Sequence, residues 1–275
     1  MTAVLLALGS AALFGAMTVS VRLGLATGAD AALGTLATVL PALAVTLVAA
    51  AARHDPSGVW PFLLTGLLGP GLSQILFTLA IREIGASRTS VAVGGAPLAS
   101  VAIALVFLHE PARAPLLAGA CAIVAGGILL AAERGRPGHL RARGLLLAGG
   151  AALVFATRDN IVRDLHAHAS PETAGAATLL GGALVAALWA RRVPPPRVLA
   201  AFAPAGMLFG LSYVCLFEAY WRARVTVVSP LVATESLFGV LFAALLLRRT
   251  EGMGPRLAAG ALLVVAGGAL IGAFR

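Results

Sequence analysis

Long apolar runs alternate along the chain with short polar connectors. The runs are about twenty residues long, and the charged side chains gather between them or near their ends. A helix needs about 20 apolar residues to cross a hydrocarbon core of about 30 Å. The pattern therefore predicts ten membrane-spanning helices, over residues 4–25, 31–52, 60–81, 89–108, 115–132, 144–163, 172–190, 198–219, 225–247 and 255–274.

The composition fits a membrane protein better than a soluble domain. Only 11% of the 275 residues are charged and 60% are hydrophobic, whereas a soluble domain carries about 25% charged residues. The predicted fold class is therefore an all-α polytopic membrane protein, surrounded by the lipid bilayer. The net charge of +9 comes from arginines at span ends, which indicates headgroup contact and topology rather than nucleic-acid binding.

The second half of the chain echoes the first at an offset of about 140 residues. Residues 116–130 and 257–271 are identical at nine of fifteen positions. Because each copy holds an odd number of spans, the second copy enters the membrane from the opposite side. We therefore predict ten transmembrane helices in two inverted five-helix repeats, residues 1–133 and 144–275, joined by the basic linker 134–143.

This symmetry predicts function as well as fold. Inverted repeats place a substrate site near the middle of the membrane, and access alternates as one half rocks against the other. We therefore predict a secondary transporter. The connectors after the odd-numbered spans carry 13 arginines, and the other connectors with the C-terminus carry 7. By the positive-inside rule, this distribution predicts that both termini lie outside.

Several residues within the spans and at their ends resemble those of a known family of carriers. They are Phe14-Gly15 with Arg22, Pro97 with Glu110, and Glu251 with Gly260 and Gly267-Gly268. With ten spans in two repeats, the chain is similar over nearly its whole length to the EamA-type branch of the drug/metabolite transporter superfamily. It departs from the family pattern at Phe14, where tryptophan is usual, and at Phe238, where the counterpart of Pro97 would fall.

The resemblance implies what the chain transports. It implies export of small metabolites, in particular amino acids including hydrophobic and aromatic ones, across the bacterial inner membrane and without a cofactor. It also implies a cavity lined by the third, fourth, eighth and ninth spans. In addition it implies that both termini are cytoplasmic, which disagrees with the orientation that the arginine distribution predicts. A lipid or lipid-phosphate flippase on the same scaffold is the alternative. An enzyme is not expected, because the chain lacks G-x-S-x-G and H-E-x-x-H motifs and its five histidines lie on connectors.

Two pairs of polar residues lie deep inside apolar spans, at equivalent positions of the two repeats. Ser73-Gln74 and Ser212-Tyr213 each follow a Gly-Leu pair. Polar groups in hydrocarbon need partners or water, so we expect these side chains to face the bundle or a cavity. They are either anchors in a mostly apolar substrate pocket or hydrogen bonds between helices, worth about 0.6 kcal/mol on average.

Glu235 is the residue that most strongly indicates a functional site. It lies roughly ten residues from either end of its span, where a carboxylate costs about 2.5–3.5 kcal/mol even on the mildest scale. It either binds a substrate amine, takes a coupling proton, or is a structural glutamate that is protonated or paired with an arginine. The predicted substrate-binding set is Ser73, Gln74, Thr78, Ser212, Tyr213, Thr234, Glu235 and Ser236.

The other polar and sulfur-containing residues are predicted to be structural, and no catalytic or metal-binding residue is predicted. Cys121 and Cys215 lie inside apolar runs, which is typical of small hydrophobes rather than of a disulfide or metal pair. Arg158-Asp159-Asn160 is predicted to be an ion-paired helix end at the membrane interface, and Glu110 and Glu251 are predicted to cap span ends. The expected partners are a small-molecule substrate, coupled protons and lipid, and the sequence leaves the oligomeric state open.

Overall fold

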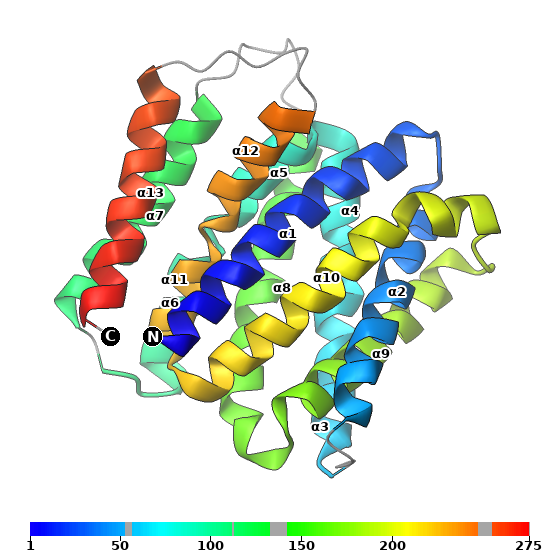
Figure 1. Ribbon diagram of the computed structural model, residues 1–275, viewed down its shortest axis with the longest axis horizontal. Helices are drawn as coiled ribbons and strands as arrows, with labels where there is room; N and C mark the ends of the chain where they lie inside the picture. The colour runs from blue at the N-terminus through cyan, green and yellow to red at the C-terminus, as the bar shows by residue number, and fades with distance from the viewer. Residues whose placement is uncertain (53–56, 112, 133–141, 247–254, 275) are drawn as a thin grey trace.

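The computed structural model is an all-helical bundle in the residues that it describes, which are 1–52, 57–111, 113–132, 142–246 and 255–274 (Figure 1). Its elements in chain order are α1 (Thr2–Ala26), α2 (Ala31–Ala51), α3 (Val59–Gly66), η1 (Leu67–Leu72), α4 (Ser73–Ile84), α5 (Ala86–Val93), α6 (Ala96–Phe107), α7 (Ala114–Ala132), α8 (Ala142–Asp164), η2 (Leu165–His168), α9 (Pro171–Ala190), α10 (Pro196–Arg222), α11 (Val225–Val232), α12 (Glu235–Leu246) and α13 (Pro255–Phe274).

Both ends of the described chain lie at the same end of the bundle, which we call the terminal face (Figure 1). The end of α7 and the start of α8 lie at the opposite end, which we call the linker face. Because consecutive helices run between the two faces, each position along a helix corresponds to a depth in the bundle.

Helices occupy every range in which the sequence predicts a span. Seven of them are long and apolar enough to cross a membrane, namely Thr2–Ala26, Ala31–Ala51, Val59–Ile84, Ala142–His168, Pro171–Ala190, Pro196–Arg222 and Val225–Leu246. Shorter apolar stretches lie in the other three ranges, namely Ala96–Phe107, Ala114–Gly126 and Leu262–Ile271. By length and composition, the described residues thus hold seven candidate spans where the sequence predicts ten.

The fourth and ninth predicted spans are broken in the middle, although the sequence predicts continuous helices there. α5 and α6 meet at Gly94-Gly95, and α11 and α12 meet at Ala233-Thr234. Pro97 follows the first break and Pro230 precedes the second. Proline lacks the backbone N–H of a helical hydrogen bond and its ring clashes with the preceding turn, which explains why α5 ends before Pro97. Pro230 lies inside α11, two residues before that helix ends, so it does not account for the second break. A third irregularity lies in η1, where Gly69 has non-helical backbone angles.

The duplicated small-residue stretch builds a closely packed helix pair. α7 and α13 lie side by side at one edge of the bundle (Figure 1). A Cβ atom on Gly126 would lie 2.6 Å from the carbonyl oxygen of Gly260, and one on Gly267 would lie 2.6 Å from that of Gly119. Such close backbone approach drives helix association in lipid, where apolar burial between helices does not. The two similar stretches of sequence therefore contact each other in the folded protein.

Polar contacts join helices that are far apart in the sequence. The hydroxyl oxygens of Ser10 on α1 and Ser212 on α10 lie 2.9 Å apart. The side-chain amide of Asn160 on α8 donates a hydrogen bond of 3.0 Å to the carbonyl oxygen of Ser100 on α6. These bonds fix the central helices α1 and α8 against their neighbours.

Glu110 has the structural role that the sequence predicts for it. Its carboxylate accepts hydrogen bonds from the backbone nitrogens of Val225 and Thr226, both at 2.9 Å. It therefore caps the start of α11, where backbone N–H groups have no partner within the helix. Its counterpart Glu251 lies outside the described residues.

The contrast between two adjacent glycines tests the packing of α7 on α13. We expect Gly267→Ala to destabilise the protein by about 1–3 kcal/mol, because the new methyl group would press against the backbone of α7. Gly268→Ala is the matched control, since the nearest atom to its Cβ would be a Leu231 methyl group at 3.7 Å. Thermal unfolding of the purified protein in detergent measures both. Equal unfolding temperatures for the two variants would contradict this description of the helix pair.

Candidate functional site

A small cavity lies in the middle of the bundle, where α1, α8, α10 and the two broken spans meet. Its volume is about 50 Å³. It is lined by Ser10, Phe14, Val93, Ala96, Pro97, Phe155, Arg158, Asp159, Ser212, Tyr213, Leu216, Ser229, Val232, Ala233 and Glu235. Residues at both helix breaks belong to this lining, so the interruptions between α5 and α6 and between α11 and α12 shape the cavity.

Three charged side chains meet in this cavity. Arg158, Asp159 and Glu235 are only 3%, 7% and 6% exposed. The Arg158 Nε atom lies 3.0 Å from the Asp159 Oδ1 atom. The guanidinium carbon of Arg158 also lies 5.1 Å from the ring centroid of Tyr213, within the range of a cation–π interaction. The cavity thus places one guanidinium and two carboxyl groups where the surroundings supply little solvation.

The position of Arg158-Asp159-Asn160 corrects the sequence-based prediction. The predicted ion pair exists, but the three residues are buried inside the bundle, and Arg158 and Asp159 line the central cavity. The reason is that α8 continues to Asp164 and η2 to His168, so Arg158 lies well before the end of the helical segment. Arg158 and Asp159 are therefore site residues that the sequence analysis missed.

Several polar atoms around the cavity have no hydrogen-bond partner among the described residues. They include Nη1 of Arg158 and the hydroxyl of Tyr213. The Tyr220 side chain lies beside Asp159 and Ser229, on the side of the cavity nearer the terminal face. Natural structures leave few buried polar groups unpaired, and those that remain commonly mark a place for water or a ligand. Arg158 and Tyr213 therefore offer free donors at the cavity.

The structure brings together three of the predicted substrate-binding residues. Ser212, Tyr213 and Glu235 all line the cavity. The neighbouring hydroxyls of Thr234 and Ser236 instead donate hydrogen bonds to the carbonyl oxygens of Leu231 and Ala233, at 2.7 and 3.0 Å. These two residues thus hold the turn between α11 and α12.

The other three predicted residues, Ser73, Gln74 and Thr78, form a buried cluster on α4 outside the cavity lining. Their side-chain polar atoms have no hydrogen-bond partner among the described residues. A Cβ atom on Gly69 would lie 3.3 Å from the Ser73 hydroxyl and 3.0 Å from the Arg158 Cγ atom. Ser73 of this α4 cluster therefore lies near the stem of Arg158.

Four phenylalanines pack across the cavity on the side of the linker face. The ring centroid of Phe14 lies 5.3 Å from that of Phe77 and 5.9 Å from those of Phe155 and Phe209. Phe155 precedes Arg158 by about one helical turn, on a helix that begins at the linker face. We call Phe14, Phe77, Phe155 and Phe209 the phenylalanine cluster. It separates the charged residues from the linker face.

The cavity is contracted in this conformation. Sites for small molecules usually have volumes of about 300–1,000 Å³, whereas this cavity has about 50 Å³. That volume holds a few water molecules, since one requires about 10–15 Å³. A metabolite could enter only if the surrounding helices moved apart.

Comparison with known proteins identifies the family. The sequence profile of the EamA-like transporter family matches residues 1–132 and 142–273. The chain belongs to this family. It is therefore a multi-pass membrane transporter of small molecules, because members of the EamA-like family are transporters rather than enzymes. The family resemblance found in the sequence is confirmed.

The fold is also found among solved structures. One structure, described only as "Crystal structure of protein", superposes with a TM-score of 0.82 at 19% sequence identity, covering 99% of this chain and 96% of that one. At this identity the match shows a shared fold. Among curated proteins, no sequence matches the chain significantly.

The cavity differs in one respect from what the family resemblance implies. The eighth and ninth spans and the fourth contribute as expected, through α10, α11–α12 and α5–α6. The third span does not line the cavity, and the first and sixth, α1 and α8, line it instead. α4 packs on α8 and on α1, and these two helices contribute the lining residues Phe14, Phe155, Arg158 and Asp159.

A double-mutant cycle tests the buried ion pair. We expect Arg158→Met and Asp159→Leu each to destabilise the protein by about 3–5 kcal/mol, because each leaves a buried charge uncompensated. Arg158→Met should be the worse, since it leaves the carboxyl groups of both Asp159 and Glu235 without the cation. The double variant should recover only part of the loss, because Glu235 is still left without the cation. Unfolding in detergent gives these values, and a double variant as unstable as the sum of the singles would refute the coupling.

Proposed function

We propose that the chain is a secondary transporter that exports amino acids, including hydrophobic and aromatic ones, across the bacterial inner membrane. The observation that carries the proposal is the placement of Arg158, Tyr213 and Glu235 around one cavity in the middle of the bundle. The cavity offers a cation, a hydroxyl and a carboxyl group next to aromatic rings.

This chemistry suits a zwitterion with an apolar side chain. Guanidinium groups bind carboxylates through two parallel hydrogen bonds, and Nη1 of Arg158 has no partner among the described residues. Glu235 would receive the substrate ammonium. Phe14 and Phe155 line the cavity beside these groups and would contact the substrate side chain. A zwitterion therefore brings both charges that the site can match.

The remaining polar residues would contact the substrate only when the cavity opens. Ser73, Gln74 and Thr78 carry unpaired polar atoms on α4, and Ser73 lies near the stem of Arg158. Movement of that side chain would join their cluster to the cavity and enlarge it. Ser212, Thr234 and Ser236 would then add uncharged polar contacts. Such a set of few polar groups in apolar surroundings is typical of small-molecule sites.

Alternating access is supported by the way equivalent helices pack. α1 packs on α10 and α12, and α8 packs on the equivalent helices α4 and α6. α7 packs on its own equivalent, α13, and α2 packs on α9. This is the pattern of contacts that two inverted five-helix repeats, 1–133 and 144–275, would make across a two-fold axis. The linker 134–143 would join them, and ten helices would cross the membrane.

Glu235 would couple transport to protons. Its carboxyl group can hold either a proton or the substrate ammonium, but not both. Exchange of the two at one residue would link export of an amino acid to entry of a proton. A lipid-phosphate substrate is less well supported, because two of the three charged side chains at the cavity are acidic and would repel a phosphate group.

A counterflow assay tests the proposal. Purified protein is placed in liposomes preloaded with unlabelled amino acids, and uptake of labelled amino acids is followed against protein-free liposomes. We expect saturable exchange for a subset of amino acids, and loss of that exchange in Glu235→Gln. Glu218→Gln is the matched control, since Glu218 binds Arg222 at the end of α10, outside the cavity lining.

Two results would contradict the proposal. No exchange with any amino acid, in protein shown to be folded, would exclude the amino-acid substrate class. Unchanged exchange and unchanged pH dependence in Glu235→Gln would leave Glu235 a structural residue and would remove the proton-coupling step.

A further inference from the structure

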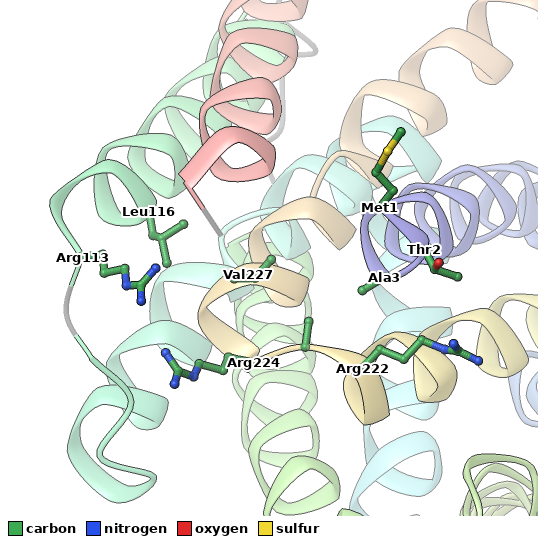
Figure 2. Close-up of a pocket in the computed structure, with 9 residues that line it drawn as sticks. Met1, Thr2, Ala3, Arg113, Leu116, Arg222, Arg224 and Val227 are labelled. Atoms are coloured by element: carbon green, nitrogen blue, oxygen red, sulfur yellow. The ribbon is translucent and has the colours of Figure 1, made fainter.

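A second pocket opens at the terminal face, away from the central cavity. It has a volume of about 630 Å³ and lies between the start of α7 and the turn that joins α10 to α11 (Figure 2). Its lining consists of Met1, Thr2, Ala3, Arg113, Leu116, Arg222, Ala223, Arg224 and Val227. Nothing in the proposed transport cycle uses these residues.

The charge of this pocket is unbalanced. In the described part of the chain, its lining holds three arginines and no acidic residue. Arg222 is neutralised outside the pocket, because its Nε atom donates a hydrogen bond of 2.8 Å to the Glu218 carboxylate. Figure 2 shows the side chain of Arg222 pointing away from those of Arg113 and Arg224, which extend toward the same part of the pocket.

Neither Arg113 nor Arg224 forms an ion pair with a described carboxylate, although Arg224 also borders Glu110 and Asp164 in a neighbouring pocket. The polar contact that the structure gives Arg113 is a long one, 3.5 Å from its Nη1 atom to the Phe274 carbonyl oxygen. Both guanidinium groups are exposed, and an anion between them would lower their mutual repulsion. The pocket therefore has the electrostatics of an anion site.

The floor of the pocket is apolar and lies at the level where the spans end. Leu116 is in the first turn of α7 and Val227 in the first turn of α11, and both are buried. At the end of a membrane span, the abundant anions are lipid phosphates. A free inorganic anion could also pair with the arginines, whereas a lipid phosphate is already held at this level by its acyl chains in the bilayer.

We propose that this pocket binds the headgroup of an anionic phospholipid, with the phosphate between Arg113 and Arg224. Arginine is suited to this role because its planar group binds phosphate oxygens in pairs. Arg113 immediately precedes α7, and Arg224 immediately precedes α11. The bound lipid would therefore join the α7–α13 pair at the edge of the bundle to the half-helix whose other end reaches the cavity.

Lipid retention measured by native mass spectrometry tests the proposal. The purified protein is incubated with equimolar phosphatidylglycerol and phosphatidylcholine, and the bound lipids are counted. We expect phosphatidylglycerol to be retained in preference, and Arg113→Ala/Arg224→Ala to lower that retention about twenty-five-fold, from about fivefold for each arginine. Arg113→Lys/Arg224→Lys should keep part of it. The test does not depend on the transported substrate or on transport activity.

The matched control removes two arginines from the opposite end of the bundle. Arg192 and Arg197 are exposed near the start of α10 at the linker face, and Arg192→Ala/Arg197→Ala should retain phosphatidylglycerol as the unmodified protein does. Equal loss in the two double variants, or no loss in Arg113→Ala/Arg224→Ala shown to be folded by thermal unfolding, would overturn the proposal. Displacement of the lipid by millimolar inorganic phosphate would overturn it too, by identifying a site for free anions.

Discussion

Three charged side chains inside an apolar bundle constrain the rest of this structure. Removing an ion from water costs several kcal/mol even after the protein relaxes, and a partner offsets that cost only with good geometry. Arg158 and Asp159 meet this requirement with a distance of 3.0 Å between Nε and Oδ1. Glu235 joins them from the start of α12. The central helices must therefore enclose this group closely, and any motion that opens the cavity must supply new partners from water or substrate.

Small residues and helix breaks make that enclosure possible. Close approach at glycines, as between Gly126 of α7 and Gly260 of α13, lets the bundle pack without large side chains between its helices. The breaks at Gly94-Gly95 and Ala233-Thr234 bring helix ends to the level of the charged group. The phenylalanine cluster covers the group toward the linker face, while the polar side chain of Tyr220 lies toward the terminal face. The two sides of the cavity therefore differ in chemistry.

The sequence predicts the helical spans well because each needs a long apolar run, and it predicts Glu235 because a carboxyl group in the middle of such a run is rare. It does not predict the role of Arg158, which lies near enough to the end of its span to be mistaken for an interfacial arginine. Its burial depends on α10, whose Tyr213 covers the guanidinium from more than fifty positions further along the chain. The positions of Gln74 and its neighbours behind α8 likewise depend on packing between helices, which one sequence without structure does not reveal.

The central claim is that the cavity recognises both charges of an amino acid. The most direct measurement is competition for uptake of a labelled aromatic amino acid such as phenylalanine, in the reconstituted protein, by analogues that lack one charged group. Phenylalaninamide lacks the carboxylate that Arg158 would bind, and 3-phenylpropionate lacks the ammonium that Glu235 would bind. The account predicts that unlabelled phenylalanine competes and that each analogue is at least about tenfold weaker, since an unpaired buried charge is left behind. Equal competition by 3-phenylpropionate would contradict it, because the site would then recognise no ammonium group.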